Sequence, residues 1–143
     1  SQEEEKEILL RMGKLAAPPS PSPVLTAQDI LDTRKLVNEV YVDDKIINYI
    51  LNIIFATRHP KEFQVKIDGL LMYGASPRAT IALKLAAQAH AFLAGRAFVT
   101  PQDIKQIAPD VLRHRLRRSY EAEAEDISPD EIILAILSTL PVP

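Results

Sequence analysis

The chain has 143 residues, of which 47% are hydrophobic and 25% charged, and its formal net charge at pH 7 is -2. This length suits one globular domain that buries about two thirds of the surface exposed by its unfolded form. The slightly acidic balance gives no global attraction to nucleic acid or anionic membranes, and the absence of cysteine excludes disulfides, thiolate catalysis and cysteine-based zinc sites. No apolar run approaches the roughly 18 residues of a membrane span, so we expect a cytoplasmic protein.

The first predicted element is a helix from Glu3 to Ala17, with acidic residues in its first turn. It stops at Pro18, where four prolines within residues 18–23 predict a stiff, extended linker. The chain has no initiator Met and opens within a helix. We therefore expect a fragment of a longer protein.

Capping residues then mark a series of helix starts, which predicts an all-α fold, a compact helical bundle. Of the helices after the linker, the first is expected to run to about Val40 and the second to about Arg58. Pro109 is expected to interrupt the fourth, which begins at Thr100. Only residues 62–67 alternate like a strand, and without an obvious pairing partner they are interpreted as a loop or an isolated edge. The predicted starts lie at Thr26, Asp43, Ser76, Thr100 and Ser128.

Arg78 stands at an unusual position in this pattern. Ser76 as N-cap and Pro77 as first helical residue place Arg78 at the positive end of the helix dipole, where a cation is disfavoured by roughly 0.3 to 1 kcal/mol. The polar residues of this helix, spaced at four, predict one solvated stripe from which Arg78 is turned by about 120°. Two interpretations stay open: an arginine that extends over its own apolar neighbours, or an anion site built from guanidinium and helix terminus.

Two other sequence patterns are weaker indications of a functional site. Residues 69–76 have the glycine spacing of a phosphate-binding loop, but Ala75 replaces the required lysine, so the glycines are interpreted as shaping a turn. The basic segment 113–118 is predicted to be helical, with charge compensation by the acidic residues that follow it favoured over contact with phosphate or an acidic partner.

No catalytic constellation is evident in the sequence. His59, His90 and His114 are far apart and lack metal-ligand spacing, so no metal site is expected. The acidic residues fall mostly at expected caps and turns, and no nucleophile stands in a recognisable triad. By itself the chain does not resemble an enzyme.

The segment Gly74-Ala75-Ser76-Pro77-Arg78-Ala79 resembles the sensor-2 motif of the MoxR family of AAA+ ATPases. The resemblance extends from about Leu25 to the C-terminus and implies a helical AAA+ lid. Further motifs of the family's lid domain match at residues 40–44, 56–58, 95–96, 99–104, 108–109 and 112–115.

This resemblance implies a role for each part of the chain. Residues 1–17 would be the terminal helix of the ATPase core, 18–24 a proline-rich linker, and 25–143 the lid. Arg78 would contact ATP, with Gly74, Ser76 and Pro77 shaping the turn that aims it. The Walker A and B motifs, which the family carries upstream, are not found in this sequence, so the fragment alone is not expected to hydrolyse ATP, and Mg²⁺ would be bound through the core.

The resemblance also implies partners. The lid would contact its own AAA+ core and the neighbouring subunits of a hexameric ring. The candidate interface residues are Arg113, Arg115, Arg117 and Arg118, of which the motif match favours Arg115. Such ATPases remodel or mature other proteins, including ones with von Willebrand factor A domains. The alternatives are a stand-alone helical adaptor, a nucleic-acid-binding module, which the charge does not favour, and the lid of a magnesium-chelatase-like ATPase.

Overall fold

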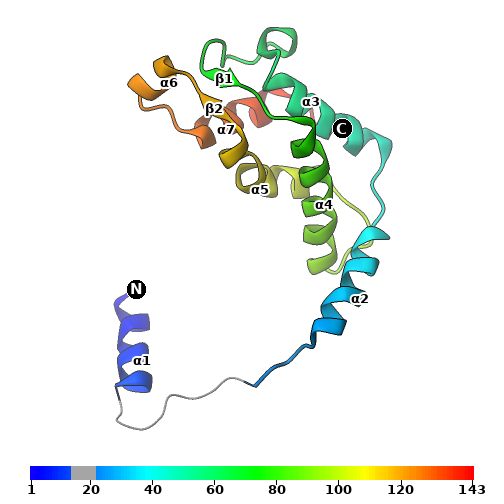
Figure 1. Ribbon diagram of the computed structural model, residues 1–143, viewed down its shortest axis with the longest axis vertical. Helices are drawn as coiled ribbons and strands as arrows, with labels where there is room; N and C mark the ends of the chain where they lie inside the picture. The colour runs from blue at the N-terminus through cyan, green and yellow to red at the C-terminus, as the bar shows by residue number, and fades with distance from the viewer. Residues whose placement is uncertain (14–21) are drawn as a thin grey trace. The chain divides into compact units, whose positions relative to one another are not determined.

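The computed structural model describes residues 1–13 and 22–143, which form two compact units, Ser1–Leu31 and Asp32–Pro143. Within these ranges there are seven α-helices, two short 3₁₀ helices and one two-stranded sheet (Figure 1). The predicted all-α class is confirmed, with the small sheet as an addition.

The first unit contains helix α1 (Gln2–Met12) and the start of α2 (Ala27–Asn38). Ser1 and Glu4 form a capping box at the start of α1, a helix with no buried side chain. Thr26 begins α2 as predicted: Asp29 Oδ2 accepts from the backbone N–H of Thr26 at 2.7 Å and from its hydroxyl at 2.6 Å. The end of the first predicted helix, 14–17, and residues 18–21 of the linker lie outside the described residues.

The second unit continues through α3 (Asp44–Ala56), α4 (Pro77–Leu93), α5 (Pro101–Leu112), α6 (Tyr120–Ala124) and α7 (Pro129–Thr139). Asp43 caps α3, and capping boxes begin α5 at Thr100 and α7 at Ser128. The predicted interruption at Pro109 is wrong, because α5 continues through this residue to Leu112.

Helices α3, α4, α5 and α7 pack around a single apolar core (Figure 1). Helix α4 contributes a stripe spaced at four residues, in which three alanines allow α3 and α5 to approach closely. The predicted solvated stripe of α4 is only partly correct: Gln88 is buried, and its Nε2 donates to the carbonyl of Val40 at 2.8 Å. Fully buried core side chains include Ile53, Ile54, Leu83, Ile104, Leu112, Ile133 and Ile136.

The sheet was not predicted. Strand β1 (Leu71–Tyr73) pairs antiparallel with β2 (Arg117–Arg118), so that Tyr73 lies opposite Arg117. Residues 62–67 form no strand, in agreement with their interpretation as a loop: η1 (Pro60–Phe63) is a 3₁₀ helix, and Val65 and Ile67 reach the core from the turns after it. The sheet joins the segment leading into α4 to the basic segment 44 residues later in the chain.

Candidate functional site at the start of helix α4

Arg78 is exposed on the first turn of α4 and makes no hydrogen bond or ion pair with any residue of the described ranges 1–13 and 22–143. Ser76 occupies the N-cap position as predicted, but its hydroxyl accepts no hydrogen bond from the helix. The first turn also contains no acidic residue. The positive end of the helix dipole and a free guanidinium therefore meet at one exposed place, an arrangement that favours an anion.

The turn that leads to Arg78 is fixed by the end of α3. The backbone N–H of Ala75 donates to the hydroxyl of Thr57 at 2.9 Å, and Arg58 Nε donates to the carbonyl of Ala75 at 2.6 Å. Thr57 is 3% exposed and Ala75 is fully buried. Both polar groups of the Ala75 backbone are thus held by two consecutive side chains; we refer to Thr57 and Arg58 as the clamp.

Gly74 is required by the close approach of the clamp. A Cβ at this position would lie 2.5 Å from the carbonyl oxygen of Thr57 and 2.8 Å from its Oγ1. Side chains larger than hydrogen would force the turn away from α3. The predicted role of Gly74 in shaping the turn is consistent with this contact.

Arg58 is itself held in place by an aromatic neighbour. Its guanidinium carbon lies 5.4 Å from the centroid of the Phe55 ring, within the range of a cation–π interaction. The ring of His59 stacks on the same phenylalanine, with the centroids 6.4 Å apart. The orientation of Arg58 is therefore set by α3 and the residues that follow it.

The glycine spacing at 69–76 does not form a phosphate-binding loop. Gly69 adopts a positive φ of 78° in a turn, and residues 71–73 are strand β1. A strand paired with β2 cannot wrap its N–H groups around a phosphate. The interpretation of these glycines as turn residues is the one that agrees with the structure.

The basic segment 113–118 forms no α-helix, contrary to the prediction. Helix α5 ends at Leu112, and the segment continues as the 3₁₀ helix η2 (Arg113–Arg115) and strand β2. Arg113 is neutralised by Asp130 at 2.9 Å and Asp110 at 3.1 Å. Asp130 and Asp110, and not the acidic run after the segment, compensate the charge of Arg113.

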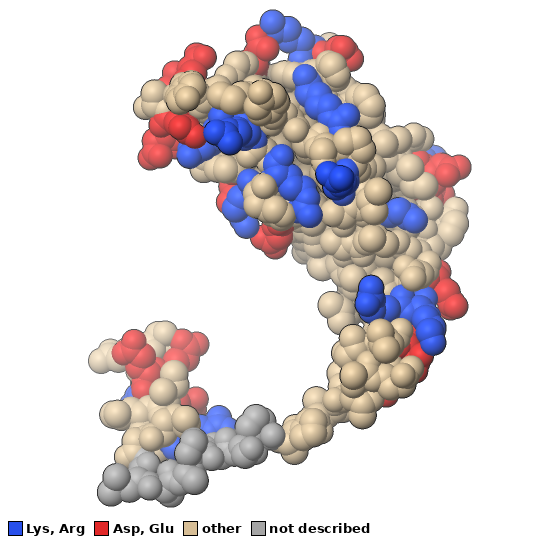
Figure 2. Space-filling view, in the orientation of Figure 1, with Lys and Arg blue, Asp and Glu red and all other residues tan. Residues whose placement is uncertain are grey.

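The other three arginines of this segment differ in how they are engaged. Arg115 donates to the carbonyl of Val111, and Arg118 donates to the carbonyl of Ile127 at 2.9 Å. Arg117 is exposed, with no side-chain hydrogen bond or ion pair to any described residue. Figure 2 shows basic side chains in separate groups over β2, α4 and the end of α5. Of the four predicted interface residues, Arg117 is the one whose side chain has no partner among residues 1–13 and 22–143, and the predicted interface itself stays a prediction.

A buried charged cluster lies at the other end of α4. Asp103 is 1% exposed and accepts from Arg96 at 2.8 Å, from the Thr100 hydroxyl at 2.7 Å and from His90 Nδ1 at 2.7 Å. Burial alone would raise the pKa of Asp103, but these hydrogen bonds outweigh it and hold the pKa well below its usual range. The sequence predicted a helix start at Thr100, but not the burial of Asp103 or its bonds to His90 and Arg96.

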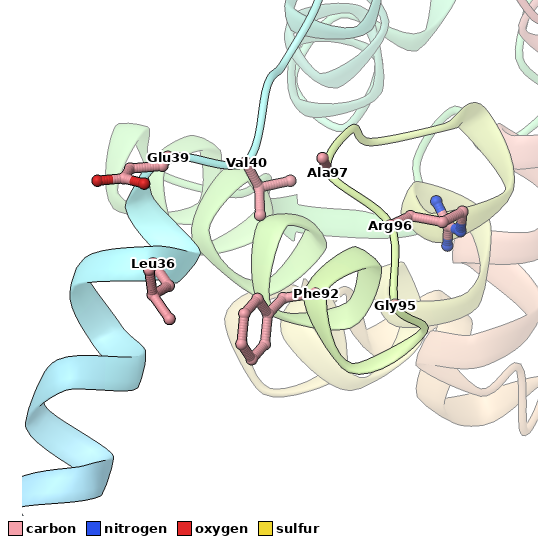
Figure 3. A pocket seen from close by; sticks show the side chains of 7 residues that line it. All are labelled: Leu36, Glu39, Val40, Phe92, Gly95, Arg96 and Ala97. Carbon is pink, nitrogen blue, oxygen red and sulfur yellow. The ribbon is translucent and has the colours of Figure 1, made fainter.

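The second unit contains a cavity of about 560 Å³. Figure 3 shows the side chains that line it, among them the apolar Leu36, Val40 and Phe92. Phe92 is 14 residues after Arg78, which places them about 21 Å apart along α4. The cavity is therefore not part of the Arg78 site. Within the described part of the chain, no group of three potential metal ligands comes together and no helix is long and apolar enough to cross a bilayer.

Comparison with known proteins identifies this helical unit. Residues 67–136 match the family described as AAA lid domain. The chain is 38% identical to the chaperone MoxR1 of Mycobacterium tuberculosis over 144 residues, an alignment that covers all of this chain and 38% of MoxR1. It is 40% identical to the protein MoxR of Methylorubrum extorquens over 81 residues, covering 55% of this chain and 23% of that protein.

A crystal structure of a candidate ATPase from Cytophaga hutchinsonii superposes with a TM-score of 0.94 at 36% identity, over the whole of this chain and 44% of the other. The second unit thus contains an AAA lid domain. The chain is homologous to the MoxR family of chaperones and ATPases and spans only part of those proteins, less than half of the length of each relative compared here.

Proposed function

We propose that Arg78 is the sensor-2 arginine of this lid and that it contacts the γ-phosphate of ATP bound by the ATPase core of the full-length protein. The observation that carries the proposal is the exposed, unpaired guanidinium on a helix turn with no acidic residue and no side-chain cap. A γ-phosphate satisfies the guanidinium and the helix terminus together.

Such a contact couples nucleotide state to lid position. ATP gives Arg78 a γ-phosphate to bind and ADP does not, so the two nucleotides stabilise different positions of the lid. A hydrogen bond to a charged group contributes about 1.5 to 3 kcal/mol, enough to change the ratio of two lid positions by roughly 10- to 150-fold. Hydrolysis in the core would then move the lid and, through it, the protein being remodelled.

The same proposal assigns the remaining segments. Residues 1–17 would close the nucleotide-binding core, 18–24 would connect it to the lid, and 25–143 would move as the lid. ATP and Mg²⁺ would be held by the core and not by the lid alone. In a ring of subunits, the unpaired Arg117 is the residue we assign to contact with a neighbouring subunit, in preference to Arg115, which is engaged by Val111.

The experiment is a comparison of ATP turnover in the full-length protein and its Arg78→Ala variant. Lys84→Ala is the matched control, because Lys84 is an exposed cation on the same helix, six residues further on. We expect Arg78→Ala to fold normally, since it removes no core side chain, and to lower turnover at least tenfold while Lys84→Ala stays near the wild type. Equal turnover in Arg78→Ala and the wild type would refute the assignment.

A further inference from the structure

The free guanidinium of Arg78 has no partner in the lid to hold it, so its position depends on the backbone that precedes it. Only Ser76 and Pro77 separate Arg78 from Ala75. The pyrrolidine ring fixes φ at Pro77, which leaves few degrees of freedom between the two. Whatever fixes Ala75 therefore fixes the origin of the Arg78 side chain.

The clamp connects Ala75 to the buried core of the second unit. The Thr57 hydroxyl donates to the carbonyl of Ile54 at 2.6 Å while it accepts from the N–H of Ala75. Ile54 is fully buried in the core of α3. A continuous chain of hydrogen bonds thus runs from the core, through Thr57, to the turn that carries Arg78.

Arg58 completes the restraint by holding the next peptide, the one between Ala75 and Ser76. Its Nε holds the Ala75 carbonyl, and Phe55 holds its guanidinium. Restraining the N–H and the carbonyl of Ala75 holds the two peptide planes on either side of its Cα, and therefore restricts the φ and ψ angles of Ala75. This is more than packing requires, because Ala75 already has its methyl group buried in the core.

We infer that Thr57 and Arg58 are positioning residues for Arg78: they orient the sensor arginine and transmit its contact with nucleotide to α3. The inference rests on the proposed function of Arg78. In this proposal neither side chain contacts nucleotide, so each influences ATP turnover only through Arg78. Removing the clamp from a protein that already lacks the sensor arginine therefore changes nothing further in turnover.

A double-mutant cycle in the full-length protein tests this dependence. Thr57→Val keeps the shape of the side chain and removes the hydroxyl. In the wild-type background we expect it to lower kcat/KM for ATP about three- to tenfold, through loss of the hydrogen bond that holds the Ala75 N–H. In the Arg78→Ala background we expect a change of less than twofold. Thr57→Ser, which restores the hydroxyl, returns activity to within about twofold of the wild type.

The matched control is Thr100→Val, which removes a threonine hydroxyl from a different hydrogen-bonded site of the same lid. Its effect on kcat/KM, whatever its size, is expected to be the same in both backgrounds. If Thr57→Val fails to fold, Arg58→Met replaces it in the cycle, since Arg58 is only partly buried.

The outcomes separate the two proposals. A Thr57→Val effect that is equal in both backgrounds, or absent from the wild-type background, overturns the positioning role and leaves the sensor assignment of Arg78 standing. An Arg78→Ala protein with wild-type turnover overturns the sensor assignment itself. A clamp effect that disappears together with Arg78 supports the inference.

Discussion

One substitution, Asp103→Asn, can measure how much the buried cluster around Asp103 contributes to the free energy of unfolding of the lid. Asp103→Asn replaces one carboxylate oxygen by an amide nitrogen, which cannot accept from Arg96 or His90. The remaining amide oxygen, Oδ2, can still accept from Thr100 and from Arg96 Nη1, so the bonds lost are those that Oδ1 accepts from Arg96 Nη2 and His90 Nδ1. Two charge-assisted hydrogen bonds are lost, a cost of about 3 kcal/mol, reduced to about 2 to 3 kcal/mol because the side chain of Arg96 is 30% exposed and can turn to water.

Urea denaturation of the 143-residue chain, followed by far-UV circular dichroism because the sequence contains no tryptophan, measures this loss. With a slope of about 1.5 to 2 kcal/mol per M for a domain of this size, we expect the midpoint of Asp103→Asn to fall by about 1.5 M. Asp130→Asn is the control: its partner Arg113 is 47% exposed, so removing this surface pair should cost less than about 1 kcal/mol. An Asp103→Asn midpoint equal to that of Asp130→Asn would refute the reasoning.

The pH dependence gives a second readout of the same group. Because the pKa of Asp103 is depressed in the folded protein, its contribution is fully present above the unfolded pKa near 4 and is lost as pH falls toward the folded pKa. The difference in free energy of unfolding between wild type and Asp103→Asn should therefore shrink between about pH 5 and pH 2. A difference that stays constant over this range would contradict the assignment.

Two further substitutions test local structure by the same denaturation assay. Ser128→Ala removes the hydroxyl that accepts from the N–H of Glu131 at 3.2 Å and should cost about 1 kcal/mol; an unchanged midpoint would show that the capping box does not stabilise α7. Gly95→Ala should cost about 1 to 2 kcal/mol from backbone conformation alone, since φ is 71° and nothing lies within 4 Å of the new Cβ. A larger loss than this would point to a steric conflict that the structure does not contain.

Helix starts were the part of the fold that the sequence predicted well. The chemistry at Asp43, Thr100 and Ser128 is local, because each cap and its N–H partner lie within three residues of each other. The short elements β1, β2 and α6 were not predicted, because local sequence patterns do not determine them. Strands β1 and β2 have only three and two residues and exist because they pair across 44 positions, while α6 has five residues, too few to show a helical period.

The residues of the candidate site also differ in whether the sequence alone could locate them. Arg78 could be located from its unfavourable place on a helix dipole and from the motif around it. The clamp could not, because Thr57 and Ala75 are 18 residues apart and no spacing rule relates them. The failed helix prediction at 113–118 has a similar cause: the arginines favour a helix locally, but pairing with β1 determines the backbone of the last two.

Binding of ATP and ADP to the full-length protein, measured by titration calorimetry on the wild type and Arg78→Ala, tests the central claim most directly. The account predicts that Arg78→Ala weakens ATP binding by about 10- to 100-fold and changes ADP binding by less than about threefold, because only ATP carries the phosphate that Arg78 contacts. Equal changes for the two nucleotides, or none for either, would contradict the claim that Arg78 senses the γ-phosphate.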